Sequence, residues 1–401
     1  MSRPSRVVVA GASAAGLSVA ETLRREGFDG SITMIGDEDS APYDRPPLSK
    51  EILSGKWPEQ RVWLREESAI DALDLDLRLG VRATGADAAA RNVELADGST
   101  VPYDELVIAT GVRPRRLPGT DDVPGVHVLR TLADARALRA ELEAKPRLVI
   151  VGAGFLGAEV AAVARQVGAD VTLVSDLQAP LSDVLGDDLG RLLVDTHREH
   201  GVEVITGVLV KEVLTSDGRV AGVRLADDRV IEADAVLVAI GSVPNTEWLG
   251  GSGIEVGDGV VCDEFCRAAP GVWAAGDVAS WQHPTLGERL RIEHRTNAAE
   301  QGMAVARNIL GEPKPFAPVP YIWSDQYDRK IQIYGLPRGA DRFAVTDGGL
   351  ADGRLVALYG RDEVVRAAVG INMVRPVRAA RAHVASRTAW DAAVSQEGAT
   401  A

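Results

Sequence analysis

The fold is decided by the stretch Leu148-Val149-Ile150-Val151-Gly152-Ala153-Gly154-Phe155-Leu156-Gly157-Ala158-Glu159. It begins with a continuous apolar run, which is typical of a buried parallel strand, and passes through a Gly-x-Gly-x-x-Gly turn into an alanine-rich helical segment. A second apolar run, residues 170–174, follows the helix. This order predicts a doubly wound sheet that binds a dinucleotide, with the pyrophosphate at the positive end of the helix.

The same pattern occurs once more, near the N-terminus. Val7-Val8-Val9-Ala10-Gly11 leads into an alanine-rich helical run, and another apolar segment, residues 31–35, follows. The turn reads Gly11-Ala12-Ser13-Ala14-Ala15-Gly16, so Ser13 occupies the second glycine position, where its small side chain can still face a phosphate. Two dinucleotide sites in one chain indicate one tightly held cofactor and one that exchanges.

This N-terminal segment has an alternative interpretation. Arg3 and Arg6 followed by an apolar run and small residues imitate a secretory signal. The internal repeat favours a buried strand instead. Cys262 and Cys266 are the only thiols, so we expect no dependence on disulfides and a reducing cytoplasm as the location.

An acidic residue after the second strand of each unit usually holds the adenosine ribose. Asp37 is placed for that role in the first unit, with Glu38 adjacent. In the second unit the strand ends at Ser175, and Asp176 comes one residue later. No Arg or Lys stands there to take a 2′-phosphate, which favours NAD over NADP.

Composition and charge set the remaining limits. The 401 residues are 46% hydrophobic and 25% charged, as in a soluble globular protein of two or three domains. The net charge of −14 argues against wrapping nucleic acid or lying on an anionic membrane. No apolar run approaches the ~20 residues that span a bilayer. Six His and two Cys leave little material for a metal cluster, so we expect none.

The chain changes character after residue 320. Short strand candidates separated by Gly and Asp turns precede a helix from about Met373, which predicts a small α+β domain with an antiparallel sheet. These candidates are Ile331–Tyr334, Phe343–Thr346, Leu355–Leu358 and Val364–Val369. The predicted fold class is therefore α/β, with two Rossmann-like dinucleotide-binding domains and a C-terminal α+β domain.

A more specific signal is the segment Ala41-Pro42-Tyr43-Asp44-Arg45-Pro46-Pro47-Leu48-Ser49-Lys50. It resembles the FAD-dependent, NADH-linked ferredoxin reductases that serve bacterial cytochrome P450s and ring-hydroxylating dioxygenases, a family that includes the putidaredoxin and biphenyl-dioxygenase reductases. The resemblance runs from about residue 5 to about residue 385. Further matching segments are Ala109-Thr110-Gly111, Leu129-Arg130-Thr131, Gly152–Glu159, Trp273–Val278, Arg291–His294, Asn297-Ala298 and Trp323–Asp328.

The resemblance implies three domains and a reaction. Residues 1–111 and 242–319 would form a discontinuous FAD domain, residues 112–241 the NAD domain, and residues 320–401 the C-terminal domain. FAD would accept hydride from NADH and release single electrons to a small [2Fe–2S] ferredoxin that feeds a cytochrome P450 or an oxygenase. Because this chain is acidic overall, docking would use a local basic patch, and oligomeric state is left open. Candidates for the patch are Arg289, Arg291, Arg295, Arg329 and Lys330.

The resemblance also assigns residues to the two sites. Lys50 would lie beside the reacting flavin nitrogen, and Glu159, in the first helical turn, would pair with Lys50 or hold the nicotinamide. Without a site, Lys50 would be a solvated lysine and Glu159 would complement the helix dipole. The predicted FAD-binding residues are Gly11, Ser13, Ala14, Ala15, Gly16, Asp37, Arg45, Lys50, Ala83, Thr110, Gly111, Arg130, Gly276, Asp277, Arg295 and Trp323. The predicted NAD-binding residues are Gly152, Gly154, Phe155, Leu156, Gly157, Glu159, Asp176 and Gly241.

Other activities remain as alternatives. The related disulfide reductases and NADH peroxidases need a reactive cysteine in the segment corresponding to residues 42–50, and this chain has none there. A rubredoxin acceptor is the nearest rival. A redox-responsive binding protein similar to apoptosis-inducing factor is another, and direct reduction of oxygen would be a side reaction. Arg295 departs from the family pattern, which has an aromatic or apolar residue at that position in many members.

Overall fold

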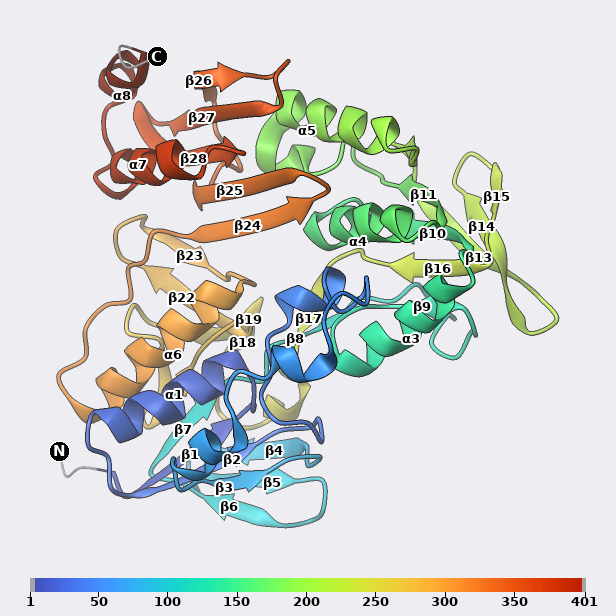
Figure 1. Ribbon diagram of the computed structural model, residues 1–401. Helices are drawn as coiled ribbons and strands as arrows, with labels where there is room; N and C mark the ends of the chain where they lie inside the picture. The colour runs from blue at the N-terminus through green and yellow to red at the C-terminus, as the bar shows by residue number, and fades with distance from the viewer. Residues whose placement is uncertain (1–3, 399–401) are drawn as a thin grey trace. The chain divides into compact units, whose positions relative to one another are not determined.

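The computed structural model describes residues 4–398, and the chain divides into two compact units (Figure 1). The first unit comprises Met1–Arg45, Glu59–Arg113 and Val243–Pro318, and the second comprises Pro46–Pro58, Pro114–Ser242 and Val319–Ala401. The three predicted domains, with boundaries at 111/112, 241/242 and 319/320, divide the chain differently, since they place Pro46–Pro58 in the FAD domain, and they stay a prediction.

The first unit is built on a six-stranded sheet of order β20-β21-β7-β1-β2-β3. All neighbours are parallel except the β20–β21 pair. Strand β1 is interior and its residues 7–10 are buried, as the internal repeat predicts. Helices α1 (Ala14–Arg25) and α6 (Arg295–Leu310) pack against each other. The strands are β1 (Arg6–Ala10), β2 (Ser31–Ile35), β3 (Asp76–Arg78), β7 (Glu105–Ile108), β20 (Arg267–Ala269) and β21 (Val272–Ala274).

Two smaller sheets and short helices complete this unit. The sheets are β4-β5-β6 and β18-β19-β22-β23. Their strands are β4 (Ala83–Asp87), β5 (Asn92–Leu95), β6 (Thr100–Pro102), β18 (Val256–Gly257), β19 (Gly259–Cys262), β22 (Ala279–His283) and β23 (Glu288–Leu290). The short helices are η2 (Glu59–Val62), α2 (Glu67–Asp71) and η3 (Glu247–Leu249). Strands β8 (Val112–Pro114) and β17 (Ser242–Pro244) pair where the chain passes between the units.

The second unit repeats the architecture around a five-stranded parallel sheet of order β12-β11-β10-β16-β9. Its strands are β9 (Val126–His127), β10 (Arg147–Val151), β11 (Asp170–Val174), β12 (Glu203–Ile205) and β16 (Ala235–Val238). Its helices are α3 (Leu132–Glu143), α4 (Phe155–Gln166) and α5 (Ser182–Glu199), with η1 (Pro46–Ser49) contacting α4. A small antiparallel sheet contains β13 (Val210–Ser216), β14 (Arg219–Leu225) and β15 (Val230–Glu232).

A five-stranded antiparallel sheet belongs to the same unit, with the order β24-β25-β28-β27-β26. One hydrophobic cluster joins Leu185, Leu189 and Leu193 of α5 to Ile331 and Ile333 of this sheet. The predicted C-terminal strands and helix are confirmed, and β24 is an additional strand at the edge. The elements are β24 (Tyr321–Gln326), β25 (Arg329–Gly335), β26 (Arg342–Gly349), β27 (Arg354–Arg361), β28 (Val364–Ile371), α7 (Val374–Ala385) and α8 (Trp390–Gly398).

The two glycine-rich turns share one geometry. Gly11 (φ +127°) and Gly152 (φ +106°) have backbones that L side chains rarely adopt, and a Cβ there would lie 2.1 Å from the Ala109 oxygen and 2.3 Å from the Ala239 oxygen. A Cβ on the last glycine of either turn would lie 1.9 Å from the oxygen of the first. These collisions explain why glycine is required at the outer positions of both turns.

Candidate functional site

The starts of α1 and α4 are suited to bind phosphate. Ser13 and Gly154 are the N-cap residues, neither helix receives a side-chain cap, and neither carries an acidic residue in its first turn. The free N–H groups and the positive end of the helix dipole therefore remain available to an anion. The residues present fit the pyrophosphate of a dinucleotide in both units.

The middle position of each turn is less constrained than the outer two. Gly154 has an extended backbone (φ −72°, ψ −174°), and a Cβ there would meet nothing within 4 Å. Ser13 is also extended (φ −126°, ψ −157°). Serine therefore fits the backbone at this position without strain. The open space at Gly154 is where a pyrophosphate would approach. Among the other predicted NAD residues, Phe155 and Leu156 are partly buried and form the first two positions of α4.

Lys50 and Glu159 form a buried ion pair in the second unit. Lys50 Nζ lies 2.5 Å from Glu159 Oε2, and the side chains are 14% and 7% exposed. Ser49 Oγ donates to the same oxygen over 2.7 Å, and Ser324 Oγ donates to Oε1 over 2.8 Å. Glu159 is the fifth residue of α4, so it lies beyond the first helical turn in which we expected it. Its carboxylate is held by three side chains rather than by the helix dipole.

Three other residues that were predicted to bind a cofactor also belong to the second unit. Arg130 precedes the capping box of α3, and its N–H donates to Asp134 Oδ2 over 2.9 Å. Trp323 is on β24 and stacks with Tyr321 at a centroid separation of 5.9 Å. Gly241 (φ +92°) is exposed after β16, and its carbonyl accepts from Arg115 N–H over 2.9 Å.

In the first unit, Arg45 is fixed by its neighbours. Its Nη2 donates to Glu38 Oε1 over 2.7 Å, and its guanidinium lies 5.1 Å from the Tyr43 ring centroid. Tyr43 Oη donates to Glu38 Oε2 over 2.5 Å. Burial lowers the pKa of Arg45, but the nearby Tyr43, Glu38 and Asp277 reverse that effect and leave it raised. Glu38 thus holds Arg45, while the adjacent Asp37 is exposed and lies 3.7 Å from Arg82.

Arg295 forms an ion pair with Asp44, which lies in the segment 41–50 that carries the family resemblance. Its Nε donates to Asp44 Oδ1 over 2.6 Å, and both side chains are about one-third exposed or less, at 26% and 35%. Arg295 is the first residue of α6, where the helix dipole disfavours a cation. Asp44 offsets that charge locally.

Two side chains that sequence reasoning missed hold the remaining loops. Asn245 brackets Thr110: its carbonyl accepts from Thr110 Oγ1 over 2.8 Å and its Nδ2 donates to the Thr110 carbonyl over 2.9 Å. Gln301 Oε1 accepts from the Gly276 N–H over 2.9 Å. Gly276 (φ +80°) lies close to Ala15, because a Cβ on it would be 3.0 Å from the Ala15 Cβ.

These contacts bring several predicted FAD residues together. The start of α1, which contains Ala14, Ala15 and Gly16, adjoins the Gly276–Asp277 turn. Gly111 (φ +64°) follows Thr110 in the loop after β7, and its carbonyl accepts from Asn245 N–H. Ala83 is buried at the start of β4. The sequence gives no sign of the roles of Asn245 and Gln301, because each makes hydrogen bonds to backbone groups of residues far away in the chain.

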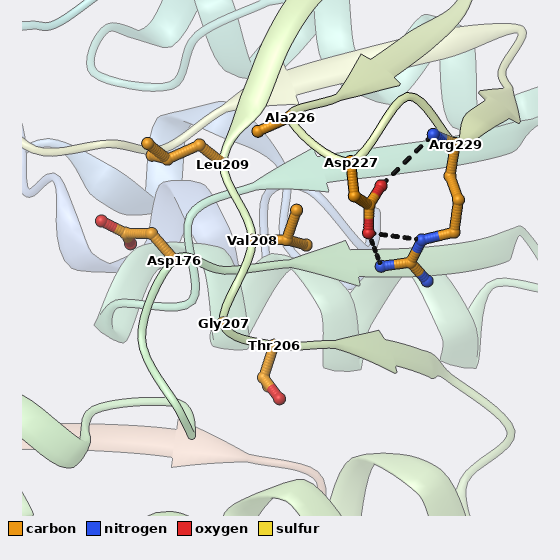
Figure 2. A pocket seen from close by; sticks show the side chains of 8 residues that line it. All are labelled: Asp176, Thr206, Gly207, Val208, Leu209, Ala226, Asp227 and Arg229. Atoms are coloured by element: carbon orange, nitrogen blue, oxygen red, sulfur yellow. Dashed lines mark hydrogen bonds and ion pairs between the residues drawn. The ribbon is translucent and has the colours of Figure 1, made fainter.

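The structure places Asp176 on the wall of an open pocket of about 540 Å³ in the second unit (Figure 2). Ser175, one residue earlier, is buried, and its Oγ accepts from Leu177 N–H over 3.1 Å. The exposed acid is therefore Asp176. Arg229 lines the same pocket, which the sequence did not reveal, and it is paired with Asp227 at 2.8 Å. The lining residues are Asp176, Thr206, Gly207, Val208, Leu209, Ala226, Asp227 and Arg229.

The two thiols are free and buried in the first unit. Burial raises the pKa of Cys262 well above its ordinary value and that of Cys266 to about 12. Both therefore stay protonated at neutral pH, which is unfavourable for a nucleophile or a dithiol relay. Within residues 4–398 no group of three or more His, Cys, Asp or Glu side chains is arranged to hold a metal, and no helix is long and apolar enough to cross a membrane.

The four arginines and one lysine that were predicted to form a basic patch all have partners. Arg289 donates to the carbonyls of Cys262 and Ser280. The other four have carboxylate partners, which are Asp258 and Glu293 for Arg291, Asp44 for Arg295, Asp328 for Arg329, and Asp325 for Lys330. Three of the five lie in the first unit and two in the second.

Helix α7 carries a different set of cations. Arg375, Arg378 and Arg381 are exposed and spaced three residues apart, so they follow one side of the helix. Among the described residues, none of the three has an ion pair or a hydrogen bond through its side chain.

Comparison with known proteins places this geometry in context. Residues 5–302 match the family model described as pyridine nucleotide-disulphide oxidoreductase, and residues 321–401 match the one described as reductase C-terminal. Rhodocoxin reductase of Rhodococcus erythropolis is 39% identical over 84% of this chain and 80% of its own length. The ferredoxin–NAD(+) reductase component of an anthranilate 1,2-dioxygenase system from Burkholderia cepacia is 39% identical over 94% of each chain.

A solved structure agrees with these relatives. The crystal structure of the covalent putidaredoxin reductase–putidaredoxin complex contains a chain that is 34% identical to this one. It superimposes with a TM-score of 0.92 and covers 96% of this chain and 94% of its own. The fold class predicted from the two glycine-rich turns is thereby confirmed.

Proposed function

This chain belongs to the pyridine nucleotide-disulphide oxidoreductase family and is an NADH-dependent ferredoxin reductase that uses FAD, and we propose which of its residues carry that activity. When bound, FAD would accept two electrons from NADH and release them singly to a ferredoxin. We propose that this ferredoxin is a [2Fe–2S] protein that feeds a cytochrome P450 or a ring-hydroxylating oxygenase. The NADH side rests on the second unit and the FAD side chiefly on the first.

The buried Lys50–Glu159 pair is the observation that carries the proposal. Its side chains are 14% and 7% exposed, and no cysteine stands in residues 42–50. A fixed ammonium group in a largely dry site stabilises negative charge that develops nearby. Lys50 therefore supplies that positive charge, and Glu159 fixes its position and can accept a hydrogen bond from the nicotinamide amide. These two residues are the proposed catalytic pair.

The proposed FAD contacts follow the first glycine-rich turn and the loops that adjoin it. The α1 N-terminus receives the pyrophosphate, with Ser13 in contact. Asp277 accepts from hydroxyls of the ribityl chain, and Arg45 is held for contact by Glu38. Asp37, Ala83, Thr110, Gly111, Arg130, Gly276, Arg295 and Trp323 complete the proposed set, and the domain boundaries predicted from the sequence are proposed with it.

The proposed NADH site uses the α4 N-terminus for the pyrophosphate and Asp176 for the ribose. Asp176 is exposed beside the pocket in Figure 2, so its carboxylate is accessible to a ribose hydroxyl. We expect Asp176→Asn to raise the KM for NADH about tenfold, because a charged hydrogen bond is replaced by a neutral one. Steady-state kinetics with NADH and NADPH checks this, and an unchanged KM would remove Asp176 from the site.

We also propose transient docking of the ferredoxin through a basic patch. Four of the five residues chosen from the sequence pair with carboxylates and Arg289 donates to backbone carbonyls, whereas Arg375, Arg378 and Arg381 on α7 are exposed and without ion pairs among the described residues. These three are therefore the stronger candidates for attracting an acidic partner. The buried, protonated thiols support a reducing, cytoplasmic location.

Anaerobic stopped-flow spectroscopy tests the function. The yellow holoprotein is mixed first with NADH and then with a [2Fe–2S] ferredoxin. We expect rapid bleaching of the flavin, a long-wavelength charge-transfer band and then fast reduction of the ferredoxin. Bleaching without transfer to any ferredoxin or rubredoxin would point to the binding-protein alternative. A protein that cannot be reconstituted with FAD would overturn the cofactor assignment.

A further inference from the structure

A run of buried side chains leads away from Glu159 within the second unit. Ser324 and Gln326 lie on the same face of β24, two residues apart, and both are 0% exposed. Ser324 Oγ lies 2.8 Å from Glu159 Oε1, and Gln326 Nε2 lies 3.3 Å from Ser324 Oγ. One carboxylate oxygen of Glu159 thus rests on neutral groups from β24, while the other faces Lys50 and Ser49.

The run continues into α5. His197, also 0% exposed, places Nε2 3.2 Å from Gln326 Oε1 and Nδ1 3.2 Å from Tyr327 Oη. The His200 ring stacks on the Tyr327 ring, with the two centroids 3.7 Å apart. An unbroken series of side-chain contacts therefore joins Tyr327, His197, Gln326, Ser324 and Glu159.

With the Gln326 amide placed as the structure has it, the direction of each hydrogen bond in this series follows from its acidic end. An ionised carboxylate only accepts, so Ser324 must donate to Glu159 and must accept from the amide nitrogen of Gln326. The amide oxygen of Gln326 can only accept, so His197 carries its proton on Nε2. In a neutral imidazole Nδ1 then accepts, and the donor to it is the phenol of Tyr327.

The environment of His197 agrees with this neutral form. Burial lowers the pKa of His197 to about 4, and burial raises the pKa of Tyr327. At neutral pH the imidazole is therefore uncharged and the phenol keeps the proton that it donates. All donors then point toward Glu159, and hydrogen bonds aligned in one direction polarise and strengthen one another.

We propose that Tyr327, His197, Gln326 and Ser324 form a positioning chain that holds Glu159 Oε1 fixed, so that Oε2 alone changes partners between Lys50 and the nicotinamide of NADH. The proposal rests on the function proposed above for Glu159. In this proposal none of the four residues touches the flavin or the nicotinamide. They act through Glu159.

The chain has a second consistent arrangement. If His197 carried its proton on Nδ1, Gln326 would turn its amide nitrogen toward Nε2 and its oxygen toward Ser324. The Ser324 hydroxyl would then donate to Gln326, and Glu159 would lose that bond. The Tyr327 phenol can donate to Nδ1 or accept from Nδ1–H, so it bonds to His197 in either arrangement. The Glu159 carboxylate, which can only accept, favours the arrangement in which Ser324 donates to it.

Variants of His197 separate positioning from packing. His197→Leu removes the donor to Gln326. His197→Gln keeps a donor near the place of Nε2, since its side-chain amide nitrogen reaches as far as that ring atom. Tyr359→Phe is the matched control: it removes a buried bond, Tyr359 Oη to the Leu185 carbonyl at 2.6 Å, between the same helix and the same sheet but outside the chain. FAD content and the urea midpoint of each holoprotein verify folding.

The first measurement is anaerobic reduction of the FAD-loaded variants over a range of NADH concentrations. We expect His197→Leu and Ser324→Ala to lower the limiting rate about tenfold, as misplacement of a reacting group does. We expect His197→Gln to recover most of the rate and Tyr359→Phe to match the wild type. Adding His197→Leu to Glu159→Gln should cost nothing further, because both act through one carboxylate.

The second measurement needs no cofactor. Magnetic resonance of isotope-labelled histidine ring nitrogens in the apoprotein, with His197→Gln used to assign the signal, reports which nitrogen carries the proton. We expect the Nε2–H form at neutral pH in the wild type, and the same form in Tyr327→Phe, where an Nδ1–H would be a buried donor without this acceptor. Finding a charged ring or the Nδ1–H form in the wild type would overturn the proposal.

The kinetic outcomes distinguish this proposal from the one beneath it. If Glu159→Gln slows reduction but His197→Leu behaves like Tyr359→Phe, the positioning chain is wrong and the role of Glu159 stands. Equal losses in His197→Leu and His197→Gln would also reject the chain, because packing alone would explain them. If Glu159→Gln is as fast as the wild type, the role of Glu159 is wrong and the chain has nothing to position.

Discussion

Lys50 Nζ lies 2.5 Å from Glu159 Oε2, in a pair whose side chains are almost withdrawn from water. The two residues are 109 positions apart in the chain: Lys50 directly follows η1, and Glu159 is on α4. A charge pair in such surroundings is costly to desolvate, and removing one member leaves the other uncompensated. Placing it beside the glycine-rich turn of α4 is therefore consistent with a functional reason for keeping it.

Replacing Lys50 by Met should slow reduction of the flavin by NADH about 100- to 1000-fold, the usual cost of losing one electrostatic donor at a reacting centre. Glu159 would retain Ser49 and Ser324 as donors, which reduces the cost of leaving its charge unpaired, and the urea midpoint of the FAD-loaded variant checks that it folds. Lys50→Arg should recover only part of the rate, because its planar fork differs from a compact ammonium. Stopped-flow absorbance measures both. A wild-type rate in Lys50→Met would show that the pair is structural.

Gly154 and Gly157 should respond differently to the same added methyl group. A Cβ at Gly157 would lie 1.9 Å from the Gly152 oxygen, whereas one at Gly154 would have open space. We expect Gly157→Ala to lower the free energy of unfolding by about 1–3 kcal/mol or more. Gly154→Ala should unfold like the wild type but raise the KM for NADH about tenfold, because the methyl group stands where the pyrophosphate approaches.

Urea denaturation and steady-state kinetics check this pair. Each variant serves as the control for the other, since both sit in one turn and both gain a single methyl. Equal unfolding midpoints for the two variants would contradict the geometry of the turn. An unchanged KM in Gly154→Ala would remove the pyrophosphate from this position.

His197 should make stability depend on pH. Burial chiefly, with a smaller contribution from His200, lowers its pKa from 6.5 to about 4. The unfolded chain therefore binds a proton at this residue before the folded one does, so its contribution is complete above about pH 6.5 and is lost as pH falls toward about 4. The loss is of the order of 3 kcal/mol.

Urea midpoints measured across this pH window, for the wild type and His197→Gln, isolate the contribution. The curve for the variant should be flatter, because its amide does not titrate while the other histidines are retained. Parallel curves would show that His197 is charged in the folded protein or exposed to solvent.

Charge reversal on α7 should weaken ferredoxin docking and leave reduction by NADH unchanged. We expect Arg378→Glu with Arg381→Glu to raise the KM for ferredoxin about tenfold at low salt, with a smaller effect at high salt because exposed charges are screened. Arg191→Glu on α5 is a suitable control, since Arg191 is an exposed arginine already paired with Asp188. A similar loss in the control would attribute the effect to net charge.

Local chemistry explains how much of the fold was predictable. Gly16 and Gly157 are required by collisions within their own turns, whereas Gly11 and Gly152 are required by collisions with Ala109 and Ala239. All four glycines occur in the same Gly-x-x-x-x-Gly spacing, so the two doubly wound units could be predicted from the sequence. Lys50 and Glu159 were expected to pair from the family resemblance. The pair is present, while the catalytic role assigned to it stays a prediction.

The supporting contacts could not be read in the same way. His197 and Gln326 are 129 positions apart, and neither residue type in isolation predicts the other. The same holds for Asn245 with Thr110, separated by 135 positions. The sequence did not predict that Asp44, Asp325 and other carboxylates pair with the residues of the proposed basic patch. Such pairing depends on how the folded chain brings basic and acidic residues together. Arg229 likewise reaches the pocket of Asp176 from a remote hairpin.

The hydrophobic core that α5 shares with the C-terminal sheet limits where this chain can be truncated. Leu181, Leu185, Leu189 and Leu193 recur every fourth residue, and all are buried in the cluster that contains β25, β27 and β28. A fragment that ended before β24 would present this apolar stripe to water. Such a fragment would be prone to aggregation. Engineering of electron-transfer fusions should therefore treat residues 114–242 and 319–398 as one indivisible module.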